Sequence, residues 1–178
     1  MSTNRTLPTT GGAGGGGGSS GAMTLLGTAT VTGAAATNLS LTGLSLDAYK
    51  SFFVVINLLG TGADSNNSVG FNSDTTAANY NVTRMRVTTV TLITRAVNAI
   101  LGALVVGAGT VGHMWIYRDL DGRATAEFRI KEENGALITY RDGFVRWSTS
   151  ANVTEVGFYQ SVASSLAIGS TFSVFGVK

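Results

Sequence analysis

The C-terminal third of the chain constrains the fold most, because it is strand-like up to the last residue. Two segments carry this pattern, Trp147–Tyr159 and Ala167–Lys178. A strand at the end of a domain has to pair inside a sheet, and its partners then lie far away in the sequence. We therefore expect a fold that is closed by long-range β pairing of its terminus.

The chain has 178 residues, no cysteine and only 12% charged residues. This length suits one domain, or one domain with an arm. Charged residues usually make up about a quarter of a protein, and Thr, Ser, Asn and Gly carry the polarity here. A surface with few charges is typical of a protein that packs against neighbours. An uncharged polar surface on a soluble monomer is the alternative explanation.

Residues 1–22 form a separate segment. Its seven clustered glycines are Gly11, Gly12, Gly14, Gly15, Gly16, Gly17 and Gly18. The segment has almost no apolar surface to offset its ordering entropy, so it cannot fold alone. We expect an extended Gly-rich arm that holds neighbouring subunits, followed by a β domain at 23–178. A passive linker is one alternative, and a cloning remnant around Gly21-Ala22-Met23 is another.

Most of the chain from Leu39 onward reads as strands separated by turn signals. Phe52–Leu59 is apolar without alternation, which predicts a central strand covered on both faces. Val82–Leu92 alternates and is rich in Thr and Val, which favours one strand. We interpret Gly60–Ser68 as a loop, and Arg95–Val106 as the one candidate helix. The sequence thus predicts an all-β antiparallel sandwich of about eight strands, with jelly-roll-like connectivity.

The segment from His113 to Ser148 predicts a meander of four short strands. Arg123–Lys131 alternates, and turns are expected at Asp121-Gly122, Asn134-Gly135 and Asp142-Gly143. A loop of two or four residues at Asp121-Gly122 places Trp115 and Tyr117 on the core face. The first of these registers pairs Trp115 with Phe128.

Several polar and aromatic groups are candidates for chemistry, and each has a simpler structural explanation. His113, the only histidine, suits a hydrogen-bonded position at the edge of the core. Loop oxygens could bind calcium, but the same residues are ordinary turn formers; they are Asp64, Asn66, Asn67, Asp74 and Asn79. Glu132, Glu133 and Glu155 are candidates for a glycosidase pair, although adjacent glutamates on a turn point apart. Four aromatic residues could form a sugar-stacking platform, namely Tyr140, Phe144, Trp147 and Tyr159, but for most of them core packing in the second sheet is favoured.

Two stretches resemble β-sandwich proteins from the virions of tailed phages. In that family a Trp-bearing strand precedes I-x-x-I-x-F-Y and then G-S-x-F-x-L-Y-G-I. Residues 144–178 follow this pattern, with Val174-Phe175-Gly176-Val177 in place of Leu-Tyr-Gly-Ile. Residues 40–80 fit as well, at Leu44–Leu59, at Gly70–Asp74 and at Ala78–Tyr80. The resemblance implies a β-sandwich that is part of a virion, and no catalytic motif comes with it.

These observations lead to an expected function without an enzyme activity, a cofactor or a metal. We expect a structural virion protein of the head decoration or cement type, homo-oligomeric and held to capsid or tail subunits by its arm. The alternative is a tail or tail-fibre adhesion module that binds a host surface glycan. The twelve Lys and Arg form no concentrated patch, so nucleic acid is not an expected partner. The N-terminus has no apolar leader, and Ala99–Gly109 is too short to span a bilayer, so no membrane is expected.

Overall fold

The computed structural model describes residues 22–61, 65–87, 90–96, 100–104, 109–134 and 137–178. Strands make up nearly all of the regular structure there, with two single 3-10 turns, η1 (Leu46–Ala48) and η2 (Ala77–Asn79). In chain order, the strands are β1 (Met23–Thr30), β2 (Asn38–Leu41), β3 (Ser51–Leu59), β4 (Ser65–Phe71), β5 (Tyr80–Val87), β6 (Val90–Ala96), β7 (Ile100–Leu104), β8 (Gly109–Arg118), β9 (Ala124–Asn134), β10 (Leu137–Trp147), β11 (Val156–Gln160) and β12 (Thr171–Val177).

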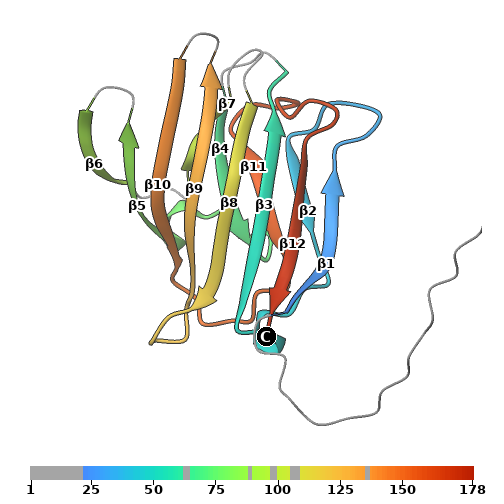
Figure 1. Cartoon of the computed structure of the whole chain (residues 1–178), viewed down its shortest axis with the longest axis vertical. Helices are drawn as coiled ribbons and strands as arrows, with labels where there is room; N and C mark the ends of the chain where they lie inside the picture. Colours follow the sequence, from blue (N-terminus) through green and yellow to red (C-terminus); the bar gives the residue numbers. More distant parts are fainter. Residues whose placement is uncertain (1–21, 62–64, 88–89, 97–99, 105–108, 135–136) are drawn as a thin grey trace, which may run out of the picture.

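The strands form two antiparallel sheets that pack face to face. The larger sheet has eight strands in the order β1-β12-β3-β8-β9-β10-β5-β6, and the smaller has four in the order β2-β11-β4-β7. Figure 1 looks onto the outer face of the larger sheet, with the smaller sheet behind it. The expected all-β antiparallel sandwich is confirmed, whereas the jelly-roll-like connectivity stays a prediction. The described strands outnumber the eight or so that the turn signals indicated.

The last strand lies inside the larger sheet, as its position in the sequence predicted. β12 pairs with β1 on one side and with β3 on the other. Its side chains alternate strictly between buried and half-buried positions. Phe172, on the buried face, lies opposite Ile56 of β3 and Ala29 of β1. Long-range pairing therefore joins the two ends of the described chain.

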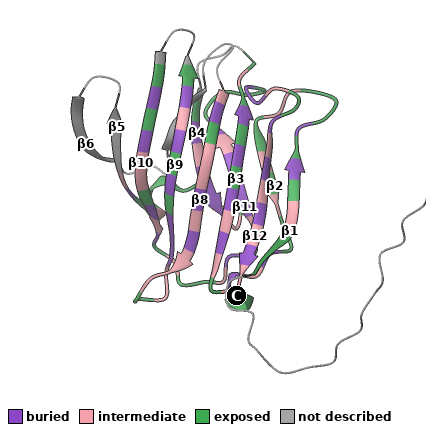
Figure 2. Ribbon diagram, viewed as in Figure 1, coloured by how far each residue is buried: buried purple, intermediate pink, exposed green. Residues whose placement is uncertain are grey.

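Apolar side chains from both sheets form one core between them, and the alternating burial along central strands such as β3 and β12 is visible in Figure 2. Phe158 of the smaller sheet meets Phe172 of the larger one edge to face, with ring centroids 4.9 Å apart. Phe71 and Trp147 make a second contact between the sheets at 5.9 Å. Aromatic rings at such distances add to the stability that comes from area burial alone.

β3 is central in the sheet, but it is not covered on both faces as expected. Phe52, Val54, Ile56 and Leu58 are buried, while Val55 is 43% exposed and Leu59 is 36% exposed. An apolar run without polar alternation therefore has one face in the core and one face outside. The prediction was wrong because the outer face of this sheet is itself apolar.

The hairpin between β8 and β9 has a loop of odd length, so the predicted register was wrong. Asp119 and Arg123 close the loop by a backbone hydrogen bond of 2.9 Å, and Gly122 takes the left-handed conformation with φ of +73°. A three-residue loop that ends on such a glycine is the next common hairpin after the two-residue turn. Trp115 therefore lies opposite Glu127, and Phe128 lies opposite Met114.

This one-residue difference exchanges the two faces of β8. Met114 and Ile116 are fully buried beside Phe128, whereas Trp115 and Tyr117 lie on the outer face. The sequence assigned Trp115 and Tyr117 to the core because only loops of two and four residues were weighed. The prediction that His113 shares a face with Trp115 is correct, since the two differ by two positions on one strand.

The remaining differences concern boundaries of elements. Val82–Leu92 belongs to two paired strands, β5 and β6, and not to one strand. The break has no signal in the sequence, because Thr88-Thr89 contains none of the usual turn residues. Asp142-Gly143 lies inside β10, so the expected four short strands are three long ones. Ser65–Ser68 belongs to β4 rather than to a loop. The candidate helix Arg95–Val106 contains the end of β6 and all of β7, because pairing of β7 with β4 overrides a weak helical pattern.

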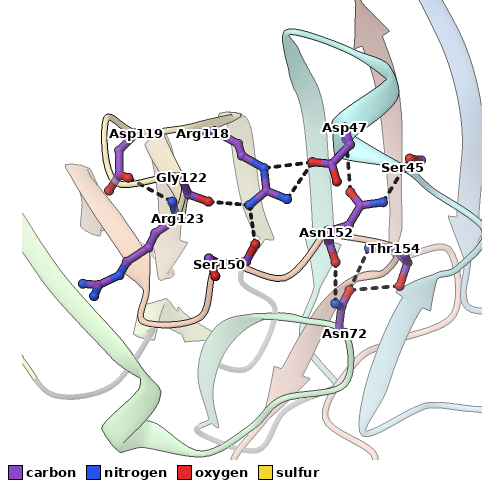
Figure 3. A network of polar contacts seen from close by, with 10 residues as sticks. All are labelled: Ser45, Asp47, Asn72, Arg118, Asp119, Gly122, Arg123, Ser150, Asn152 and Thr154. Carbon is purple, nitrogen blue, oxygen red and sulfur yellow. Dashed lines mark hydrogen bonds and ion pairs between the residues drawn. The ribbon is translucent and has the colours of Figure 1, made fainter.

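A network of polar contacts holds the loops together at one end of the sandwich (Figure 3). Two nitrogens of the Arg118 guanidinium donate to Asp47 at 2.9 and 2.6 Å, and a third donates to the Ser150 carbonyl at 3.0 Å. Asn152 accepts from the Asp47 backbone and donates to Ser45. Asn72 donates to the Asn152 carbonyl at 2.7 Å. The backbone around η1, the loop before β11 and the end of β4 are thereby fixed relative to one another.

Candidate binding surface on the eight-stranded sheet

Five apolar side chains form a line across the outer face of the larger sheet, which we call the aromatic row. Its members are Leu25, Phe175, Phe53, Trp115 and Phe144. Successive members are direct cross-strand neighbours from β1 to β8, and Glu127 lies between Trp115 and Phe144. The row arises because each of these strands presents its outward residue at the same level of the sheet.

The middle of the row is packed, and its ends are exposed. The rings of Phe53 and Trp115 lie 4.7 Å apart, and those of Phe53 and Phe175 lie 6.4 Å apart. Leu25 is 56% exposed at one end, and Phe144 is 46% exposed at the other. Other large apolar side chains on the same face are also exposed, namely Val55, Val111, Ile138 and Tyr140. This face therefore presents much apolar surface outside the core.

A shallow depression of about 390 Å³ lies between Trp115 and Phe144. Neighbouring strands are about 4.8 Å apart, so backbones two strands apart are separated by roughly 10 Å. The other residues that line the depression are His113, Glu127, Phe128, Arg129, Asp142 and Gly143. The depression thus combines two aromatic walls with charged groups, which is the composition of many ligand sites.

The charged groups of the depression are paired with neighbours. Arg129 donates to Asp142 at 3.0 Å, with both side chains largely exposed. The Tyr117 hydroxyl donates to Glu127 at 2.8 Å. Burial, the hydrogen bond to Glu127 and the negative charge of Glu127 together raise the pKa of Tyr117 to about 12. Tyr117 is therefore a neutral donor that orients the Glu127 carboxylate at neutral pH.

The aromatic and charged side chains of the depression suit the binding of a ligand or partner. The ring of His113 packs 5.7 Å from that of Phe53 on the outer face, so the expected position at the edge of the core was wrong. The carboxylates of Glu127 and Asp142 have donors of their own in Tyr117 and Arg129. Flat aromatic surface beside hydrogen-bonding groups can hold a protein segment or a sugar ring.

The four aromatic residues that the sequence singled out divide between different surroundings. Trp147 is a core residue, and its indole nitrogen donates to Asp74 at 2.8 Å. Tyr140 and Phe144 are 53% and 46% exposed on the outer face of β10, so assigning them to the core was wrong. Tyr159 is half-buried on the outer face of the smaller sheet. The four do not form one platform.

The three glutamates considered for hydrolysis have separate partners. Glu132 is buried in an ion pair with Arg141, and Glu133, on the other face of β9, pairs with Lys131. Glu155 accepts from Ser73 at 2.6 Å. The expectation that Glu132 and Glu133 point apart is confirmed, although they lie on a strand and not on a turn.

The Asn and Asp residues weighed as calcium ligands are dispersed. Asn66 and Asn67 belong to β4, and Asp64 lies outside the described residues. Asp74 accepts from the Thr76 backbone at 2.9 Å and from Asn79 at 2.8 Å, as turn residues do. In the part of the chain that the structure describes, no group of three or more acidic, His or Cys side chains could hold a metal ion.

We therefore expect chelation to leave thermal stability unchanged. The melting temperature, measured with EDTA and with added calcium, should agree within about a degree, because a ligand that does not bind the native state cannot stabilise it. Magnesium at the same ionic strength is the control. A rise of several degrees with calcium alone would contradict the assignment of these residues to turns.

The residues expected to form the arm lie outside the described part of the chain. This applies to Gly11, Gly12, Gly14, Gly15, Gly16, Gly17 and Gly18. The first strand begins at Met23.

The basic residues that lie close together in the sequence form no free patch among the described side chains. The side chains of Arg84 and Arg86 are outside the described residues, while Arg129 and Lys131 have acidic partners.

Sequence reasoning missed the aromatic row, although two signals for it are present. One is the spacing of Asp119 and Gly122, which suits a three-residue loop as well as a two-residue turn. The other is the presence of one aromatic residue in each of three strands, namely Phe53, Trp115 and Phe175. Once the register of the strands is known, these residues lie on the same face of the sheet. Each signal depends on pairing that periodicity alone does not reveal.

No family model, curated protein or solved structure matches this chain. Within the described ranges, no helix has both the length and the apolar character needed to cross a bilayer.

Proposed function

We propose that this chain is a non-enzymatic structural protein of a phage virion, of the head decoration or cement type. In this proposal the outer face of the eight-stranded sheet packs against a neighbouring capsid subunit, and residues 1–22 form an additional attachment. The chain then works as a homo-oligomeric part of the particle, without a cofactor.

The observation that carries the proposal is the aromatic row. Leu25 and Phe144 are 56% and 46% exposed at its ends, and Phe53, Trp115 and Phe175 connect them. Exposed apolar side chains that gather on one face mark an interaction surface, whereas scattered ones need no explanation. Aromatic residues at the centre and charged residues at the edge are the usual composition of a protein interface.

Charge supports the same role. The chain has only 12% charged residues, and the pairs near the row, such as Arg129 with Asp142, neutralise each other. The charged side chains beside the row are therefore largely balanced as ion pairs. The sequence resemblance to virion β-sandwich proteins gives independent support.

The proposal is tested by particles assembled with variant chains. Leu25→Lys with Phe144→Lys places charge at both exposed ends of the row and should reduce incorporation strongly, while the isolated domain keeps its melting temperature. Leu120→Lys is the matched control, because Leu120 is fully exposed at a hairpin tip away from the row. Deletion of residues 1–22 should also weaken incorporation and leave the domain folded. Normal incorporation of both altered chains would contradict the proposal.

A tail adhesion module that binds a host glycan is the second candidate function. The depression between Trp115 and Phe144 favours it, because aromatic walls with Glu127 and Arg129 beside them can stack on a sugar and bond to its hydroxyl groups. Trp115→Ala separates the two roles. Loss of adhesion with normal incorporation into particles supports the glycan role, and the reverse supports the structural one.

A further inference from the structure

A second aromatic surface lies on the other side of the molecule, where the ring of Tyr159 rests on two glycines. A Cβ atom at Gly157 would come within 2.6–2.7 Å of three atoms of the Tyr159 side chain, and one at Gly70 would come within 2.8 Å of its ring. Gly157 and Gly70 are cross-strand partners on β11 and β4, whose strands appear behind the larger sheet in Figure 1. The ring therefore lies on the backbone of the smaller sheet, with its opposite side turned outward.

The position of this ring is fixed along its length. Its hydroxyl donates to Glu155 at 3.4 Å, and Glu155 also accepts from Ser73 at 2.6 Å. Burial raises the pKa of Tyr159, and the nearby charge of Glu155 raises it as well, so the phenol is neutral. An aromatic ring held in one orientation binds a ligand without first losing rotamer freedom.

A cleft of about 220 Å³ adjoins this ring, and we call it the Tyr159 cleft. Its remaining lining residues are Asn66, Ser68, Val69, Asp74, Thr75, Ala77, Tyr80, Gln160 and Ser161. One wall is the smaller sheet at Ser68, and the other is the loop that carries Asp74 and Thr75. The cleft lies outside the aromatic row and shares no residue with the depression beside Trp115.

The loop wall is as firmly held as the ring. Asp74 accepts hydrogen bonds from Trp147, Thr76 and Asn79, and its backbone carbonyl accepts from the Tyr80 hydroxyl at 2.7 Å. Burial opposes ionisation of this carboxyl group, but the hydrogen bonds from Trp147, Thr76 and Asn79 outweigh it and lower the pKa of Asp74. These bonds hold the loop wall in place, so the cleft is preformed in the fold.

The chemistry of the lining selects a class of ligand. None of the residues that line the cleft is Lys, Arg or His, so no cationic side chain there can pair with a phosphate or carboxylate group. The hydroxyl and amide groups of Ser68, Thr75 and their neighbours both donate and accept, which matches hydroxyl groups on a ligand. A sugar ring has one face of C–H bonds that carries partial positive charge and suits the negative face of an aromatic ring. We propose that the Tyr159 cleft binds a neutral saccharide unit.

The proposal is tested by NMR titration of the full chain with methyl glycosides of glucose, galactose, mannose and N-acetylglucosamine. We expect at least one of them to shift backbone signals around Tyr159 and Ser68. Tyr159→Ala should weaken this binding about tenfold or more, since it removes the stacked ring. Tyr159→Phe should retain it, and Ser68→Leu, which fills the cleft from the sheet side, should abolish it.

Trp115→Ala is the matched control, because it removes an aromatic ring from the other face of the sandwich. Binding that survives this change and is lost in Tyr159→Ala supports the Tyr159 cleft, whether or not the chain belongs to a virion. Absence of binding to all four glycosides would overturn the proposal. So would binding that Tyr159→Ala leaves unchanged, preferential binding of choline as a cationic probe, or binding that requires Trp115.

Discussion

Replacing Phe128 with alanine is expected to lower the free energy of unfolding by about 3–5 kcal/mol, the range for truncation of a buried aromatic side chain. Phe128 is only 3% exposed, on the core face of β9 opposite Met114. The cost combines the lost burial of the ring with the cavity that remains in the core. Urea unfolding followed by tryptophan fluorescence measures it, because Trp147 lies in the same core.

Phe144→Ala is the matched control for this experiment. Phe144 is the same residue type on the neighbouring strand, but it faces outward and is 46% exposed. Its loss should cost less than about 1 kcal/mol, as for most surface substitutions. Equal costs at the two positions would mean that the register of β9 and β10 is wrong.

Removing the charge of Glu132 is expected to destabilise the domain by about 3–5 kcal/mol, because it leaves the Arg141 guanidinium buried without a counter-charge. The two side chains are 7% and 6% exposed, and their closest atoms lie 2.8 Å apart. They lie on the core face of β9 and β10, at the polar end of the interior. Glu132→Gln keeps the shape of the side chain, so it tests charge rather than packing.

Two comparisons separate charge from position. The exposed pair Arg129–Asp142 connects the same two strands with side chains 71% and 41% exposed, and Asp142→Asn should cost no more than about 1 kcal/mol. The double variant Glu132→Leu with Arg141→Met removes both buried charges and should recover most of the lost stability. If the double variant is less stable than Glu132→Gln, the buried pair stabilises the fold by itself.

The sequence was sufficient for the class of fold and for local patterns that depend on neighbouring residues. Alternation along β9 correctly placed Ala124, Ala126, Phe128 and Ile130 on one face. The closing role of the last strand followed from its position. Both inferences need only the two-residue period of a strand.

Features that depend on which strands pair, and in which register, could not be predicted from the sequence in this way. Trp115 was assigned to the wrong face because its side is set by the length of the loop at Leu120–Gly122 and not by its own neighbours. Phe53 and Val55 look like core residues in the sequence. Only the three-dimensional structure shows that, within the described ranges, no second layer covers the outside of β3. The Tyr159 cleft could not be predicted, because Gly70 and Gly157 become neighbours of the ring only through the pairing of β4 with β11.

The three-residue loop between β8 and β9 has a consequence for how such a domain can change during evolution. A substitution at Leu120, which is fully exposed, alters one side chain and leaves the pairing intact. Deletion of a single residue there forces either a different, two-residue turn between Asp119 and Arg123 or a shift of β9 by one position, and the shift would turn Phe128 outward and Glu127 inward. Descendants of a common ancestor should therefore vary freely at Leu120 but keep Gly122 and the length of this loop, so that insertions and deletions accumulate elsewhere.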